Sequence, residues 1–223
     1  SSLKSNPKKK TIYYPLSAAL WHDELIVNLN TFIENLKKKN ISDNIQIIFR
    51  VHPFYHAEKA EKRRQLFNLL KKLSTFKNVF VNFNDVEKKK NIYVLKRKDI
   101  YFTLNAYQHS EMTLSAVSSA MVEALFFNNY VINIICGKGN IRGAFWDLKN
   151  QKLHHLEHLY SYKLINNVYS HNDLIKKIKE GIGNKNNKAK LKDFVDKEAS
   201  RFKGKSAEAY LNQLLKLSKD EDI

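Results

Sequence analysis

Apolar residues along the chain occur in two patterns that alternate with each other. Short continuous apolar runs, such as those at 45–49 and 130–135, are typical of strands that are covered on both faces. Between them, apolar residues recur every three or four positions, as on one face of a helix. Strands that alternate with helices predict βαβ units and a mostly parallel sheet. The predicted strands are residues 11–16, 44–51, 78–83, 111–116 and 130–136, and the helices between them are residues 21–40, 58–74 and 119–129.

The remaining segments carry weaker patterns. Residues 84–98 are polar and are assigned to neither a helix nor a strand, and residues 137–169 show little periodicity. Helical spacing returns near the end of the chain and predicts helices at 171–183, 186–202 and 205–219. We therefore expect an α/β fold in which a parallel sheet is flanked by helices and further helices close the domain.

Composition narrows the class of protein. The 223 residues are 43% hydrophobic, which is enough for a folded core, and they carry a formal net charge of +17. Such a charge fits binding to nucleic acid, binding to anionic lipid, or a composition rich in lysine, asparagine and isoleucine without either role. The lysine clusters at 8–10, 37–39 and 88–90 lack an aromatic RNA-binding motif or zinc-finger spacing, so a nucleic-acid partner is not expected.

Two further features bear on where the protein works. No apolar run approaches the roughly 20 residues that span a bilayer, and residues 1–11 lack the apolar core of a signal peptide. The single cysteine, Cys136, cannot form a disulfide within the chain, which favours a reducing compartment. We expect a cytoplasmic protein, with peripheral contact to the inner membrane face as an option that its lysines leave open.

The strand predicted at 44–51 ends in an unusual group of polar residues. Arg50, His52 and Pro53 follow the apolar run, and proline ends a strand because it has no backbone N–H to donate. Arg50 and His52 are two positions apart, so both point to the same side of the strand. Ligands of open α/β sheets bind beyond the carboxyl ends of strands, where a cation and an imidazole suit a phosphate or a nucleotide. The alternative is an exposed charge next to a simple turn.

A second group of polar residues lies where the strand at 111–116 meets the next helix. Ser115, Ser118 and Ser119 precede the helix, whose free N–H groups and dipole favour an anion; ordinary helix capping is the alternative. Glu123 lies within the apolar run 120–127, so we expect it to be buried. A buried carboxylate needs partners, and either the two hydroxyls of a ribose or a salt bridge to Arg50 would supply them. The two strand ends therefore predict one ligand cavity between them.

At these residues the chain resembles the donor-binding, C-terminal half of GT-B-fold glycosyltransferases. The matching segments are "IIFRVHP" (47–53) and "HSEMTLSAVSSAMVEALFFNNYVINI" (109–134), which carry the His-Pro and Ser-Ser motifs of bacterial surface-polysaccharide enzymes. These enzymes include capsule transferases, sialyltransferases and CDP-glycerol glycerophosphotransferases. The order and spacing of the motifs match from about residue 11 to residue 215, which includes "GKSAEAYLNQLL" (204–215) as a closing helix.

The resemblance implies a Rossmann-like domain, one half of a GT-B fold, that binds the nucleotide-activated donor of a glycosyltransferase. It implies that a CMP-, CDP- or UDP-linked donor contacts His52, Pro53, Ser118 and Ser119, and that Glu123 holds its ribose. The positions at the strand ends add Arg50 and Ser115 to the predicted nucleotide-binding residues. The acceptor would be a glycan or a lipid-linked chain, and the product a surface polysaccharide. Two alternatives remain open: transfer of a polyol phosphate from a CDP-alcohol, and a non-catalytic module that binds nucleotide or nucleic acid.

The same resemblance bounds the domain and the chemistry. It implies a linker at 1–10, the donor-binding domain at 11–215 and a tail at 216–223, with the acceptor-binding half supplied by an N-terminal domain or a partner chain. The resemblance implies that contacts to the base and the phosphates organise the donor, so neither a cofactor nor a metal is expected. No catalytic residue is assigned. His22, His56 and His109 are candidates for a general base by residue type alone.

Overall fold

The computed structural model describes residues 9–17, 22–56, 59–84, 86–89, 92–116, 118–135 and 159–198. The chain divides into two compact units at Asn186 and Asn187. The first unit contains the sheet and the pocket described below. The second unit contains helix α8 (Lys188–Glu198). The predicted helix at 205–219, the predicted tail at 216–223 and residues 1–8 of the linker predicted at 1–10 lie outside the described residues. Lys10, the last residue of that predicted linker, belongs to the first strand.

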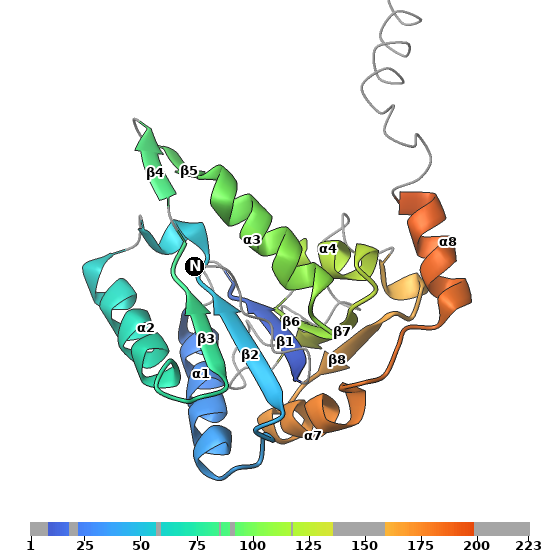
Figure 1. The fold of residues 1–223 in the computed structure, drawn as a ribbon, viewed down its shortest axis with the longest axis horizontal. Coiled ribbons are helices and arrows are strands. Elements are labelled where there is room, and N and C mark those ends of the chain that lie inside the picture. The colour runs from blue at the N-terminus through green and yellow to red at the C-terminus, as the bar shows by residue number, and fades with distance from the viewer. Residues whose placement is uncertain are drawn as a thin grey trace, which may run out of the picture. The chain divides into compact units, whose positions relative to one another are not determined.

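A six-stranded parallel sheet forms the centre of the first unit (Figure 1). Its order is β3-β2-β1-β6-β7-β8, so the chain builds outward from β1 in one direction and then from β6 in the other. The carboxyl ends of β1 and β6 therefore border the topological switch point, where open α/β sheets bind their ligands. The strands are β1 (Lys10–Pro15), β2 (Ile45–Arg50), β3 (Val79–Asn82), β6 (Met112–Ser115), β7 (Tyr130–Ile134) and β8 (Ile165–Val168).

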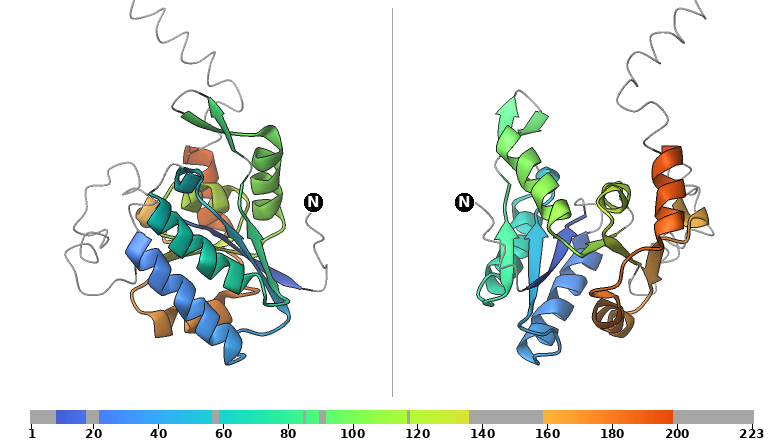
Figure 2. Two further views of the ribbon diagram at one scale, coloured as in Figure 1. Left: turned by 90° about the vertical axis from the view of Figure 1, so that its left-hand side faces the viewer. Right: turned by 45° about the vertical axis from the view of Figure 1, so that its right-hand side comes forward.

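Helices cover both faces of the sheet (Figure 2). Helices α1 (His22–Lys37), α2 (Ala60–Leu73) and α7 (His171–Gly181) bury their apolar sides in one core with alternate strand residues such as Tyr14 and Phe49. Helices α3 (Arg97–Gln108) and α4 (Ala120–Phe126) lie on the other face. There the Tyr107 ring of α3 meets the Tyr13 ring of β1 edge to face, with 4.9 Å between ring centroids. No helix among the described residues combines the length and apolar character needed to cross a membrane.

The fold class is confirmed: it is an α/β, Rossmann-like domain with a parallel sheet flanked by helices. Each of the five predicted strands overlaps an observed one, and the helices predicted at 21–40, 58–74 and 171–183 are α1, α2 and α7. The helix predicted at 119–129 is shorter than expected, because α4 ends at Phe126 and Asn128 adopts a positive φ of 60° that turns the chain into β7. Helix α8 covers part of the prediction at 186–202.

Strands β4 (Val86–Lys89), β5 (Ile92–Leu95) and β8 and helix α3 were not predicted. An antiparallel hairpin of β4 and β5 and the helix α3 occupy the stretch between β3 and β6. Strand β8 lies in the region without periodicity. Its two central asparagines are held in place by hydrogen bonds, since Asn166 donates to the carbonyl of Val131 and Asn167 accepts from Asn133. These bonds replace the apolar contacts that usually identify a strand.

Candidate functional site

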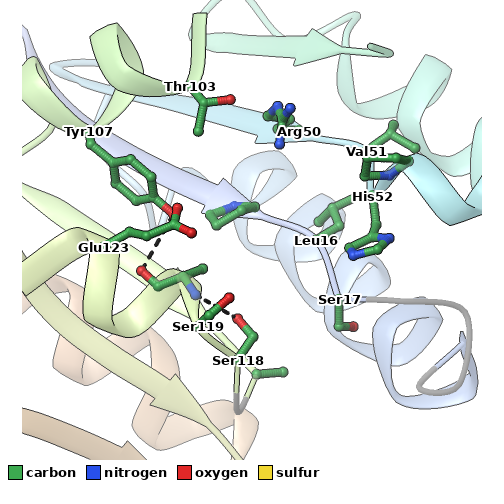
Figure 3. Close-up of a pocket in the computed structure, with 14 residues that line it drawn as sticks. Leu16, Ser17, Arg50, Val51, His52, Thr103, Tyr107, Ser118, Ser119 and Glu123 are labelled. Atoms are coloured by element: carbon green, nitrogen blue, oxygen red, sulfur yellow. Dashed lines mark hydrogen bonds between the residues drawn. The ribbon is translucent and has the colours of Figure 1, made fainter. Parts of the chain in front are cut away.

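A pocket of about 360 Å³ lies at the carboxyl ends of β1, β2 and β6, with α3 as its further wall (Figure 3). Strand β1 lies between β2 and β6 in the sheet, so the residues that follow all three strands meet at the switch point. The lining residues are Pro15, Leu16, Ser17, Arg50, Val51, His52, Pro53, Thr103, Tyr107, Ala116, Ser118, Ser119, Ala120 and Glu123.

Six of the seven residues predicted to contact a nucleotide line this pocket. They are Arg50, His52, Pro53, Ser118, Ser119 and Glu123. The seventh, Ser115, is fully buried behind the pocket at the end of β6 and is not among the lining residues. The three histidines considered as general bases lie elsewhere: His22 contacts Gln65 and Tyr55, His56 contacts the carbonyl of Phe83, and His109 ends α3.

Arg50 is the principal electrostatic feature of the pocket. Only 9% of Arg50 is exposed, and its Nε and Nη2 atoms have no hydrogen-bond partner. The hydroxyl of Tyr13, also buried, lies close to Arg50 and Thr103. Burial raises the pKa of Tyr13, against the opposing effect of the Arg50 charge, so Tyr13 stays a neutral donor. A buried guanidinium with free N–H groups is suited to an anion that accepts from both.

His52 follows Arg50 on the same side of the chain and is uncharged at neutral pH. Burial lowers its pKa, and the positive charge of Arg50 lowers it further. The imidazole is therefore a neutral hydrogen-bonding group in the pocket, while Arg50 carries the positive charge. Pro53 begins a short 3₁₀ turn, Pro53–His56, and turns the chain away from the sheet directly after His52.

The serines are arranged differently from a simple helix cap. Ser119 occupies the N-cap position of α4, but its side chain makes no capping hydrogen bond. Ser118 takes that role, since its Oγ accepts from the N–H of Ala120 at 3.3 Å and lies 2.8 Å from the Oγ of Ser115. The backbone carbonyl of Ser118 also accepts from the N–H of Met121. The N–H groups of Ala120 and Met121 at the start of α4 are thus already bonded, and the helix has only seven residues. It therefore attracts an anion less strongly than expected, and Arg50 is the main positive group of the pocket.

Glu123 lies at the mouth of the pocket and is exposed, so the prediction that it is buried was wrong (Figure 3). Helix α4 packs on β6 and β7 through Met121, Ala124 and Leu125, and the Glu123 side of the helix faces solvent although its neighbours in sequence are apolar. No ion pair joins Glu123 to Arg50 within the part of the chain that the structure describes. The carboxylate instead lies beside the Tyr107 hydroxyl, whose pKa is raised by burial first, then by Tyr13 and Glu123.

Two lining residues, Thr103 and Tyr107, come from the helix that the sequence analysis did not predict. The Tyr107 hydroxyl donates to the carbonyl of Ala120 at 3.4 Å, and its ring stacks on Phe127 with 5.7 Å between centroids. Helix α3 thus holds α4 in place and forms the wall of the pocket opposite β2. The signal for it in the sequence is weak, because only Phe102 and Ala106 of its inner residues are four positions apart. The described residues contain no cluster of three or more metal-ligating side chains.

Comparisons with known proteins agree with the fold. A putative UDP-N-acetylglucosamine 2-epimerase from Listeria monocytogenes matches 96% of this chain with a TM-score of 0.53 and 10% sequence identity. The UDP-GlcNAc 2-epimerase from Neisseria meningitidis, solved bound to UDP-GlcNAc, matches 93% with a TM-score of 0.51 and 16% identity. An α,α-trehalose-phosphate synthase (UDP-forming) from Burkholderia vietnamiensis matches 97% with a TM-score of 0.52 and 8% identity.

This chain spans less than half of the length of these structures, covering 46%, 45% and 46% of them respectively. The likeness identifies the fold as one half of a GT-B fold. No model of a protein family matches the sequence, and a search of curated proteins finds no match.

Proposed function

We propose that this chain is the donor-binding half of a GT-B-fold glycosyltransferase and that its pocket holds a nucleotide-activated sugar. The observation that carries the proposal is Arg50, a buried guanidinium with two unbonded nitrogens in a cavity at the switch point of the sheet. Leaving such a group without a partner costs on the order of 1–3 kcal/mol or more, which a bound phosphate would offset.

The donor would lie across the pocket from β2 to α4. Its phosphate would accept from Arg50 and from the Ser118 hydroxyl, and the exposed Glu123 carboxylate would accept from the two ribose hydroxyls. His52 and Pro53 would contact the base or the phosphates. As the bond from the sugar to the phosphate breaks, negative charge grows on the departing nucleotide. A fixed buried cation stabilises that charge without having to reorganise, and this is the catalytic contribution expected from Arg50.

Two kinds of comparison support a sugar nucleotide as the ligand. Two of the similar structures are named as UDP-GlcNAc 2-epimerases, one of them solved with UDP-GlcNAc, and the third is named as a UDP-forming synthase. The His-Pro and Ser-Ser segments of the sequence resemble those of surface-polysaccharide transferases, which is the basis for proposing that pathway. The acceptor and the general base would belong to the other half of the fold, as the longer similar structures suggest.

Titration calorimetry with UDP, CDP, CMP and UDP-GlcNAc tests the proposal. The parent chain is expected to bind at least one of them, and Glu123→Ala or His52→Ala to weaken that binding by about tenfold, which is the loss of one or two hydrogen bonds. Glu34→Ala on α1 and His109→Ala at the end of α3 are matched controls, because both residues are exposed and outside the pocket. Circular dichroism melts show whether each variant is folded.

Three results would refute the proposal. One is the absence of binding by a folded parent chain to any of the four nucleotides. Another is equal affinity in the pocket variants and the control variants. The third is binding that responds to the Glu34 change as strongly as to the Glu123 change, which would place the nucleotide outside the pocket.

A further inference from the structure

The chain leaves strand β3 through a turn that contacts the end of β2. Asn84, two residues after β3, has a positive φ of 57°, a conformation that asparagine adopts more readily than most residues. Its backbone N–H donates to the Oδ1 of Asn82 at 3.2 Å, which closes a tight turn. The turn ends β3, and the separate hairpin of β4 and β5 follows it (Figure 1).

The side chain of Asn84 continues the hydrogen-bond ladder that its backbone leaves. Strands β2 and β3 are parallel, and Val51 donates its N–H to the carbonyl of Asn82 at 2.9 Å. In a regular parallel ladder the next bond would run from the N–H of Asn84 to the carbonyl of Val51. Here the Nδ2 of Asn84 makes that bond instead. The chain can therefore turn away from β2 while Val51 stays hydrogen-bonded.

Val51 lies between the pocket residues Arg50 and His52, so its two peptide groups set where both residues point. The peptide group that links Arg50 to Val51 is held from both neighbouring strands. The carbonyl of Arg50 accepts from the N–H of Leu16 at 2.9 Å, and the N–H of Val51 donates to β3. The peptide group that links Val51 to His52 is held through its carbonyl by Asn84. Because a peptide group is planar, fixing this carbonyl fixes the whole group that leads into His52.

The loop after His52 depends on the same segment at the end of β3. Pro53 has no N–H with which to anchor the next peptide group. The carbonyl of His52 accepts from the N–H of Tyr55 at 3.0 Å, within the short 3₁₀ turn. At the end of that turn, the Nε2 of His56 donates to the carbonyl of Phe83 at 3.2 Å. The segment that follows β3 thus holds this loop both before and after Pro53.

We infer that Asn84 is a positioning residue of the pocket, because it fixes the peptide group that orients His52. Asn84 is not among the lining residues and acts through the buried Val51. Asparagine combines tolerance of a positive φ with a side-chain donor; glycine has only the first of these properties, and alanine has neither. The effect of Asn84 on a nucleotide rests on the proposed function, whereas its effect on His52 and the loop does not.

Titration calorimetry with UDP, CDP, CMP and UDP-GlcNAc measures the effect on the pocket. Asn84→Gly keeps the backbone conformation and removes the amide, and it is expected to weaken affinity by about fivefold, the loss of one hydrogen bond. Asn84→Ala is expected to weaken affinity equally and also to melt at a lower temperature than Asn84→Gly, because alanine is strained at a positive φ.

Asn128→Gly is the matched control for both variants. Asn128 also has a positive φ, of 60°, but it is exposed and lies at the end of α4, outside the pocket. The control is expected to bind within about twofold of the parent. Parent-like affinity in both folded Asn84 variants would overturn the inference, and circular dichroism melts establish that each variant is folded.

A double-mutant cycle separates positioning from a general loosening of the fold. In a His52→Ala background, Asn84→Gly is expected to weaken affinity by no more than about twofold, because the imidazole that Asn84 orients is gone. In a Glu123→Ala background, it is expected to keep its full effect of about fivefold, since Glu123 lies on α4. Equal losses in the two backgrounds would overturn the inference.

Amide hydrogen exchange of the free chain tests the same contact without a nucleotide. In Asn84→Gly, the N–H groups of Val51 and Tyr55 are expected to exchange about fivefold faster, whereas that of Ile47, within β2, stays unchanged. Unchanged exchange at Val51 and Tyr55 would overturn the inference. Failure of the folded parent to bind any of the four nucleotides would refute the proposed function instead, and the exchange rates alone would then decide whether Asn84 holds the loop.

Discussion

The hydroxyl groups of Ser115 and Ser118 lie 2.8 Å apart and join the buried end of β6 to the loop that lines the pocket. Ser118 Oγ also accepts from the N–H of Ala120. The buried Ser115 therefore holds Ser118 in place, and Ser118 in turn supports the first turn of α4. Ser115 thus shapes the pocket without lining it.

Ser115→Ala is expected to lower the free energy of unfolding by about 1 kcal/mol and nucleotide affinity by a few-fold, because the Ser118 side chain loses its buried partner. Ser119→Ala is the control for stability, since the exposed Ser119 makes no capping bond. Urea denaturation measures the first effect and calorimetry the second. Identical unfolding curves for the two variants would show that the serine pair has no structural role.

Arg50→Met is expected to abolish nucleotide binding and yet leave the free energy of unfolding unchanged or higher by about 1 kcal/mol. Methionine removes a buried, incompletely paired charge and fills most of its volume. Arg63→Met is the control, because Arg63 donates to the carbonyl of His56 on another part of the surface. A destabilisation above about 2 kcal/mol with affinity retained would identify Arg50 as a structural residue.

Asn129→Ala is expected to destabilise the domain by about 3 kcal/mol. Asn129 accepts from Thr113 and donates to the carbonyls of Tyr107 and Phe127, and it is 1% exposed. Its loss leaves the buried Thr113 hydroxyl without its acceptor and removes one donor each from the carbonyls of Tyr107 and Phe127. Urea denaturation measures the change, with the exposed Asn105→Ala as a control that stays within about 0.5 kcal/mol. A loss as small as that of the control would contradict the bonding described here.

Stability is expected to fall as the pH drops below 6.5. The pKa values of His52 and His171 are both lowered in the folded state, by burial first in each case and by Arg50 in addition at His52. As the pH falls, the unfolded chain therefore takes up protons at a higher pH than the folded chain does. The stability that the two neutral imidazoles contribute is fully present above pH 6.5 and is lost as the pH falls toward their folded-state pKa values. Melting temperatures from pH 5 to 8 measure this.

His52→Gln and His171→Gln are each expected to flatten that dependence, since glutamine does not titrate in this range. His109→Gln is the control, because His109 is exposed. Steeper pH dependence in either of the first two variants would mean that the imidazole is protonated in the folded protein.

Much of the fold could be predicted because its buried strands are recognisable in the sequence as short apolar runs. Runs such as Ile45–Phe49 have no polar face, and in a parallel sheet covered on both sides that is the expected pattern. Helix α3 was missed for a related reason. Its apolar residues occur on both sides, at Phe102 and Ala106 inside and at Ile100 and Leu104 outside, so no single apolar face repeats along it.

The pocket residues that follow the ends of strands could be predicted from the sequence, and those that lie on α3 could not. Arg50 and Ser118 follow β2 and β6, and parallel strands bring such residues to one edge of the sheet. The position of Thr103 depends on how α3 crosses that edge, which is set by contacts such as the ring pairs of Tyr107 with Tyr13 and Phe127. The exposure of Glu123 depends on which side of α4 packs on β6 and β7, and the continuous apolar run around Glu123 does not reveal it.

Helix α3 borders the pocket with Thr103 on one side and presents Leu104, the next residue, to the surroundings. Two adjacent residues of a rigid helix cannot move independently, so a displacement imposed from outside is carried to the pocket wall. Suppose that a partner bound at Leu104 changes the affinity of the pocket for its ligand by some factor. By thermodynamic reciprocity, the ligand then changes the affinity for that partner by the same factor. Measuring either equilibrium in the presence of the other partner therefore yields a coupling free energy for this single helix.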